Sequence, residues 1–178
     1  MIYDIMTSFL NPSDEVIVFQ PFFEFHLKEA RLLGASIVTC SLQEPKDFQT
    51  DPWTINFTEL ESLFNERTRM IILNSPHNPT GKVFTRDEYD RIAKIIAKHP
   101  KVLVIADDVY ETLTYDDRKF ISFATIPGMF ERTLSTYSLG KMFSCTGWRI
   151  GYCIGPEHLI KLVKSAHAII AFSSNRPF

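Results

Sequence analysis

The chain alternates between short apolar runs rich in β-branched residues and longer segments in which apolar residues recur with helical spacing. Strands that alternate with helices in this way pair in parallel, because each helix returns the chain to the edge of the sheet where the next strand begins. Every residue of the run 102–106 is apolar, which is typical of a central strand covered on both faces. The sequence therefore predicts an α/β fold with three layers, α/β/α, around a mainly parallel sheet. Strands are predicted at residues 16–19, 36–40, 70–73, 102–106, 133–136 and 150–154.

Local signals predict where the main helices begin and end. A helix is expected over residues 24–33, and Gly34 ends it because glycine tolerates a left-handed backbone. Residues 85–99 open with a Thr-Arg-Asp-Glu capping box and continue with apolar residues at helical spacing. Pro156 favours the start of an amphipathic helix over residues 157–172.

One stretch between these elements lacks any period. Residues 41–57 carry two prolines and scattered polar groups, so we expect a long connection without regular structure. Thr58 is then expected to cap a short helix that ends at residue 64.

Length and charge exclude several classes of protein. The 178 residues suffice for one domain with a sizeable core. Lysine and arginine number 19 against 21 aspartate and glutamate, and no basic run could follow a phosphate backbone, so nucleic acid is not an expected partner. The start of the chain lacks the pattern of a secretory signal, and no stretch reaches about 18 apolar residues, so neither export nor a membrane partner is expected.

Cysteine and histidine usage predicts no metal site. Cys40, Cys145 and Cys153 are odd in number and lack the Cys-x-x-Cys spacing of zinc or redox sites, which favours reduced thiols in the cytoplasm. The histidines show no ligand spacing and are assigned structural roles: His26, His77, His99, His158 and His167.

Polar residues follow three of the predicted strands. Residues 74–81 read Asn-Ser-Pro-His-Asn-Pro-Thr-Gly, residues 107–110 read Asp-Asp-Val-Tyr, and residues 138–141 read Ser-Leu-Gly-Lys. Taken singly, these segments are typical of a turn, a helix cap and a solvated surface charge. In open α/β sheets, however, ligands bind beyond the carboxyl ends of the strands. Their occurrence together therefore predicts a binding site at this edge.

Four blocks of sequence resemble fold-type I pyridoxal-phosphate-dependent enzymes of the class I and II aminotransferase family, and within it the kynurenine aminotransferase group, which also contains cysteine-S-conjugate β-lyase and glutamine transaminase K. The blocks are Pro21-Phe22-Phe23, residues 75–83 (SPHNPTGKV), residues 107–111 (DDVYE) and residues 138–151 (SLGKMFSCTGWRIG). The resemblance runs through nearly the whole chain. It implies that pyridoxal 5'-phosphate is the cofactor.

The resemblance assigns catalytic roles to three residues. Lys141 is similar to the lysine that binds the cofactor covalently and then moves the proton of the substrate Cα. Asp107 is similar to the carboxylate that pairs with the pyridine nitrogen and keeps it protonated. Tyr110, together with Asn78, is similar to the pair that hydrogen-bonds the phenolic oxygen of the cofactor.

The remaining matched positions imply contacts with the phosphate and the ring. Ser138 and Arg149 are similar to the phosphate ligands, because a hydroxyl donates one hydrogen bond and a guanidinium can donate two. Phe23 is similar to the aromatic residue that stacks on the cofactor ring, with Phe22 as the alternative if the register slips by one residue.

The function implied is transfer of an amino group from an aromatic amino acid, kynurenine or glutamine to a 2-oxo acid. Two alternatives stay open: β-elimination from cysteine conjugates, which proceeds from the same carbanion, and a folded fragment of such an enzyme without catalysis. The family implies a homodimer.

The family also leads us to expect a chain truncated at both ends. Residues 1–178 would be part of the cofactor-binding large domain, with a phosphate-binding turn upstream and a small domain, carrying the arginine that binds the substrate carboxylate, downstream. The cytoplasm is the expected compartment, with the mitochondrion as the alternative because the native N-terminus would lie upstream.

Overall fold

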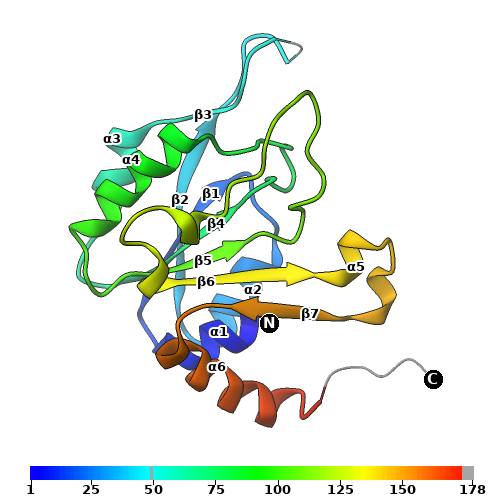
Figure 1. Cartoon of the computed structure of the whole chain (residues 1–178). Helices are drawn as coiled ribbons and strands as arrows, with labels where there is room; N and C mark the ends of the chain where they lie inside the picture. The colour runs from blue at the N-terminus through cyan, green and yellow to red at the C-terminus, as the bar shows by residue number, and fades with distance from the viewer. Residues whose placement is uncertain (49, 174–178) are drawn as a thin grey trace.

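A single twisted sheet organises the chain in the computed structural model, which describes residues 1–48 and 50–173 (Figure 1). The strand order is β3-β2-β1-β4-β5-β6-β7, and the inner strands β2, β1, β4, β5 and β6 are all parallel to one another. At the two edges, β3 and β7 run antiparallel to their neighbours. The strands are β1 (Glu15–Gln20), β2 (Ser36–Gln43), β3 (Thr54–Ile55), β4 (Thr68–Asn74), β5 (Leu103–Asp107), β6 (Thr133–Ser138) and β7 (Gly151–Ile154).

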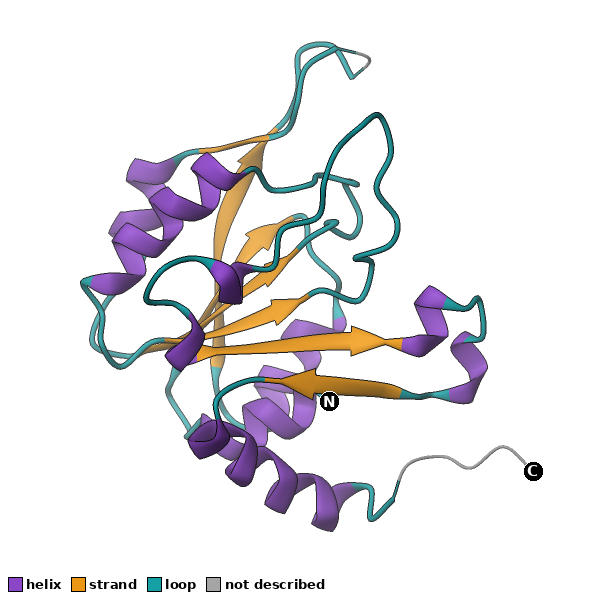
Figure 2. Cartoon of the chain, viewed as in Figure 1, coloured by secondary structure: helices purple, strands orange, loops and turns teal. Residues whose placement is uncertain are grey.

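Helices cover both faces of this sheet, which confirms the predicted three-layer α/β/α architecture (Figures 1 and 2). Helices α3 and α4 pack on one face, whereas α1, α2 and α6 pack on the other. The short α5 follows β6. The helices are α1 (Ile2–Phe9), α2 (Phe25–Leu32), α3 (Phe57–Ser62), α4 (Arg86–Ala97), α5 (Leu139–Met142) and α6 (Glu157–Ile170).

Alternation along the strands divides the core into two layers. In β1, Ile17 and Phe19 enter the cluster under α3 and α4, while Val16 and Val18 enter the cluster under α1, α2 and α6. Successive side chains of a strand point to opposite faces, so a strand covered on both sides must be apolar throughout. This explains why the central strands β1, β4 and β5 read as mainly apolar runs.

The connections bring the polar segments to one edge. The chain passes from β1 to β2 on one side and then crosses to β4 on the other side of β1, so the strand order reverses between β1 and β4. Such a reversal opens a crevice at the carboxyl ends of the strands. The segments after β1, β4, β5 and β6 all begin at that edge.

The unpatterned segment was predicted less well. Strand β2 continues to Gln43, where it pairs with β3, which the sequence did not predict. The cap of α3 is Asn56 and not Thr58, because the Asn56 side chain accepts a hydrogen bond from the backbone N–H of Glu59 at 3.1 Å. The capping box at Thr85 and the end of α2 before Gly34, which has a φ of +74°, are confirmed.

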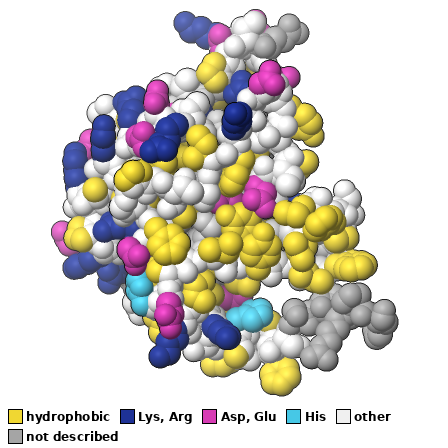
Figure 3. Space-filling model, viewed as in Figure 1, with side chains coloured by type: hydrophobic (Ala, Val, Ile, Leu, Met, Phe, Trp, Pro, Cys, Tyr) yellow, Lys and Arg dark blue, Asp and Glu magenta, His cyan; other side chains and the backbone are white. Residues whose placement is uncertain are grey.

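Large apolar side chains remain exposed on one side of the molecule. Figure 3 shows them over β7, α5 and the turn that joins β6 to β7, and Phe143, Trp148 and Ile154 are each more than half exposed. Lysine and arginine lie mainly over the side that carries α3 and α4. None of the described helices combines the length and the apolar character that crossing a bilayer requires.

Candidate functional site

The seven residues that the sequence singled out line one cavity. The cavity has a volume of about 470 Å³ and lies at the carboxyl ends of the strands. That volume falls in the range of small-molecule sites, about 300–1,000 Å³. In chain order, the seven residues are Phe23, Asn78, Asp107, Tyr110, Ser138, Lys141 and Arg149.

Asn78 is fixed by the asparagine that ends β4. The Oδ1 of Asn74 accepts a hydrogen bond from the backbone N–H of Asn78 at 2.7 Å, and its Nδ2 donates to the carbonyl of Asp107 at 2.7 Å. Asn74 therefore ties the loop after β4 to the end of β5. The Nδ2 of Asn78 in turn lies 3.5 Å from the hydroxyl of Tyr110. Two hydrogen-bonding groups from different loops thus meet at one point of the cavity.

Asp107 lies at the base of the cavity and is 5 % exposed. Its Oδ1 accepts a hydrogen bond from the hydroxyl of Thr136 at 3.3 Å. Its Oδ2 lies 3.4 Å from Nε2 of His26, an ion-pair distance that lacks the alignment of a hydrogen bond. From its spacing in the sequence, His26 was expected to have a structural role only. A buried face of α2 could have indicated it, since His26 and Ala30 are the buried residues of that helix.

A compact turn presents Ser138, Lys141 and Arg149. A Cβ on Gly140 would lie 2.9 Å from Cα of Thr146, so only glycine lets the two halves of the turn approach this closely. Arg149 has a left-handed backbone, with φ 55° and ψ 38°, which is unfavourable for a residue with a side chain. Such strain is often held at ligand-binding sites. Its guanidinium donates to the carbonyl of Thr146 at 3.2 Å and lines the cavity.

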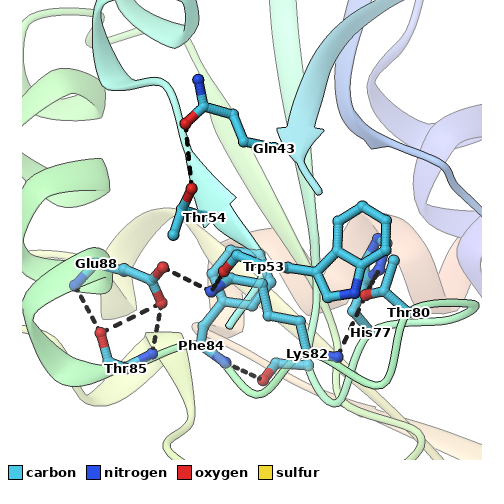
Figure 4. A network of polar contacts seen from close by, with 10 residues as sticks. Gln43, Trp53, Thr54, His77, Thr80, Lys82, Phe84, Thr85 and Glu88 are labelled. Atoms are coloured by element: carbon cyan, nitrogen blue, oxygen red, sulfur yellow. Dashed lines mark hydrogen bonds and ion pairs between the residues drawn. The ribbon is translucent and has the colours of Figure 1, made fainter. Parts of the chain in front are cut away.

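The two lysines nearest to the loops differ in their surroundings. The Nζ of Lys141 lies 5.5 Å from the ring centroid of Tyr110 and faces the cavity. Lys82 is buried instead, and its Nζ donates to Glu88 Oε1 at 2.6 Å and to the carbonyl of Trp53 at 2.7 Å (Figure 4). An amine held as a paired ammonium does not act as a nucleophile. Lys141 is therefore the better placed of the two for covalent chemistry.

Phe23 and Phe22 are separated by the structure. Phe23 is 42 % exposed and lines the cavity, where it also stacks on Phe25 with ring centroids 5.1 Å apart. Phe22 packs against the core cluster under α1, α2 and α6. Of the two phenylalanines considered from the sequence, Phe23 is therefore the one that lies at the cavity.

Two buried titratable groups flank the site without lining its cavity. Asp108 is fully buried, and burial, then the nearby Asp107 and Glu111, raise its pKa to about 8. Within residues 1–48 and 50–173, neither of its carboxyl oxygens has a partner in hydrogen-bond geometry. Burial lowers the pKa of His77 to about 4, and its Nδ1 lies 2.8 Å from the Thr80 hydroxyl. Both groups are therefore neutral near pH 7.

A second cavity of about 230 Å³ adjoins the first. Both are lined by Ile2, Glu29, Ser138 and Arg149, and Met1 also lines the second. Ile2 of α1 therefore lies at the same cavity as the Ser138 and Arg149 side chains. In the part of the chain that the structure describes, no group of three or more potential ligands could hold a metal ion.

The family model for aminotransferase class I and II matches residues 1–177. Among curated proteins, the kynurenine–oxoglutarate transaminase of Dictyostelium discoideum is 40 % identical over 182 residues, covering 97 % of this chain and 42 % of the relative. An aspartate aminotransferase of Pinus pinaster is 44 % identical over 150 residues, covering 84 % of this chain and 30 % of the relative.

Solved structures share the fold. Bna3p of Saccharomyces cerevisiae superposes with a TM-score of 0.91 at 39 % identity, covering 98 % of this chain and 42 % of that chain. The chain thus spans about two fifths of the length of the relatives it matches.

Proposed function

The chain belongs to the class I and II aminotransferase family, whose members depend on pyridoxal phosphate, and from this premise we propose that it binds this cofactor and serves amino-group transfer. Residues 1–178 are, on this proposal, part of the cofactor-binding large domain. The observation that carries the proposal is the single cavity that all seven matched residues line.

The chemistry of the donor set fits the cofactor. Asp107, a carboxylate at the base, suits a protonated ring nitrogen, and the amide of Asn78 beside the Tyr110 hydroxyl suits a phenolic oxygen. Ser138 and Arg149 suit the phosphate, because a hydroxyl and a guanidinium both donate hydrogen bonds to phosphate oxygens. Pyridoxal phosphate supplies an aldehyde that carries the amino group and a ring that accepts electrons.

The protein side chains would then divide the work between binding and proton transfer. The Phe23 ring would cover one face of the cofactor ring and keep water from it. Asp107 would hold a proton at the ring nitrogen, and Thr136 and His26 would fix the orientation of its carboxylate. Lys141 Nζ would take the proton from Cα of the substrate, because it faces the cavity and, unlike Lys82, has no buried counter-ion among the residues that the structure describes.

For the substrates we propose an aromatic amino acid, kynurenine or glutamine as donor and a 2-oxo acid as acceptor. The Dictyostelium relative, named for kynurenine and oxoglutarate, covers more of this chain than the Pinus relative, named for aspartate. A half-reaction with kynurenine, glutamine and aspartate, each supplied alone, compares these donors. Release of ammonia from a cysteine conjugate would indicate β-elimination instead.

Covalent labelling tests the proposal directly. The chain is mixed with pyridoxal phosphate, reduced with borohydride, digested and analysed by mass spectrometry. The pyridoxyl label is expected on Lys141 and is expected to disappear in Lys141→Arg. Label on Lys82 or on the exposed Lys161, with Lys141 unmodified, would contradict the assignment.

A further inference from the structure

We propose that Glu29 couples the uptake of one proton to the binding of an anion at Ser138 and Arg149. The inference rests on the proposed function, in which this end of the cavity receives a phosphate group. It concerns a residue that the matched motifs do not contain, since Glu29 lies outside all four sequence blocks.

Glu29 occupies the face of α2 that is turned toward the site. It lines both cavities, and so do Ser138 and Arg149. It follows His26 by three residues, which places the two side chains on one face of the helix. A carboxyl group therefore faces the space in which a hydroxyl and a guanidinium would hold an anion.

No partner in the structure balances this carboxyl group. Within the described residues, Glu29 makes neither a hydrogen bond nor an ion pair, although its side chain is half-buried. Ionised, it would repel an anion held at Ser138 and Arg149, because both groups would carry negative charge in one cavity. Protonated, it loses that charge and gains a hydroxyl that can donate to an oxygen of the anion.

The surroundings of Glu29 favour the protonated form. Desolvation raises its pKa, and the carboxylates of Asp107 on β5 and Asp4 on α1 act in the same direction. His26 and the terminal amino group of Met1 act against them. Arg149 and Tyr137 also face the adjoining cavity. An arriving anion adds a further negative charge, so it draws a proton from solvent onto a Glu29 oxygen, with no other bond made or broken.

Sulfate is a suitable probe, because it remains a dianion between pH 5 and pH 7.5, whereas a phosphate monoester changes its charge at about pH 6. The dissociation constant of sulfate is measured over this range for the wild-type chain, Glu29→Gln and Glu24→Gln. Glu24 is the matched control, since it is exposed and pairs with Lys28 on the outer face at 2.8 Å. Because binding takes up one proton, the affinity of the wild-type chain for sulfate should fall as the pH rises above the Glu29 pKa, by up to about tenfold per pH unit.

Glu29→Gln should bind sulfate more tightly than wild type at pH 7.5 and show a shallower pH dependence. Glu24→Gln should follow wild type. Calorimetry of the wild-type chain in buffers of different ionisation enthalpy gives a second measurement, in which sulfate binding near pH 7 should take up protons. Equal pH dependence in all three proteins, or no proton uptake, overturns the inference alone. Absence of sulfate binding in every variant overturns the anion site of the proposed function as well.

Discussion

Adjacent aspartates at the end of β5 have opposite environments because successive strand residues point to opposite faces. Asp107 faces α2, where it meets His26, whereas Asp108 lies on the side of Tyr89 and α4. Asp107 lines the cavity and accepts a hydrogen bond from Thr136, whereas among the described residues neither carboxyl oxygen of Asp108 has a partner in hydrogen-bond geometry. Two consecutive residues therefore become a group that lines the cavity, Asp107, and a buried neutral acid, Asp108.

Replacing Asp107 by Asn should leave cofactor binding partly intact and slow any amino-group transfer by at least about 100-fold, the cost of losing a charge that acts on the reacting system. Stopped-flow absorbance of the half-reaction in a protein that supports it measures this effect. Asp116→Asn, in an exposed turn, is the control and should react like wild type. A rate for Asp107→Asn within a factor of two of wild type would exclude the role.

Asp108 should make the protein less stable as the pH rises. Its folded pKa of about 8 lies above its ordinary value of 3.8, so between these values the unfolded chain has released a proton that the folded chain keeps. The free energy of unfolding therefore falls as the pH rises toward 8, by at most about 1.4 kcal/mol per pH unit. Asp108→Asn should flatten this dependence, as measured by urea unfolding at pH 6.5 and pH 8.

The choice of pH separates Asp108 from His77. The pKa of His77 is lowered from 6.5 to about 4, so its effect, a stability that falls as the pH drops, is confined to the interval below pH 6.5. A parallel pH dependence for wild type and Asp108→Asn between pH 6.5 and pH 8 would show that Asp108 is ionised in the folded protein.

Among the elements, Lys82 in the loop after β4 joins the start of α4, through an ion pair with Glu88, to the segment before β3, through a hydrogen bond to the Trp53 carbonyl. Glu88 completes the capping box of α4 through the backbone N–H of Thr85, and its other oxygen accepts from Lys82, which also donates to Trp53 (Figure 4). The backbone of Lys82 closes the loop of residues 77–82, because its carbonyl accepts a hydrogen bond from the N–H of His77 at 2.8 Å. One lysine thus connects the loop after β4 and the start of α4 with the segment before β3, which is distant in sequence.

Lys82→Met should lower the free energy of unfolding by up to about 3–5 kcal/mol, because it leaves the Glu88 carboxylate, whose side chain is only 16 % exposed, without its counter-ion. Lys28→Met is the matched control: Lys28 pairs with Glu24 at the surface, and its loss should cost less than about 1 kcal/mol. Chemical unfolding monitored by circular dichroism measures both. Equal losses for the two variants would mean that the buried pair contributes no more than a surface pair.

At the scale of the whole molecule, the exposed apolar surface predicts self-association. Only part of α6 packs on its own sheet: Leu159 and Val163 are buried, whereas Leu162 is 50 % and Ile169 is 87 % exposed. Apolar patches larger than a few hundred Å² usually mark interaction surfaces. We expect the chain to form dimers through α6 or through the face that carries the turn after β6, where Phe143 is exposed.

Light scattering at micromolar concentration should give a mass above 20.5 kDa that falls on dilution. Ile169→Glu should favour the monomer if α6 is the interface, and Phe143→Glu if the turn is. Ser165→Glu adds the same charge to an exposed polar position of α6 and is the control. A monomer at every concentration would show that these surfaces do not mediate association.

The sequence by itself determined the elements whose signals are local. Apolar runs marked the strands, the capping box at Thr85 began α4, and Gly34 ended α2, because backbone conformation there depends on the residues themselves and their near neighbours. Four motifs were enough to indicate the family, and the strand ends predicted which edge of the sheet carries the polar residues.

Tertiary structure alone decided which side chains meet. Strand β3 forms only because β2 extends to Gln43 beside it, and the two residues of β3 carry no pattern of their own. His26 and Glu29 enter the site because α2 packs with one face toward β5 and α1, and Asp108 is neutral near pH 7 because the folded chain buries it close to Asp107 and Glu111. Contacts between distant segments set how deeply a side chain is buried and which charge it carries. These properties depend on the surroundings that the folded chain provides and not on the residue type alone.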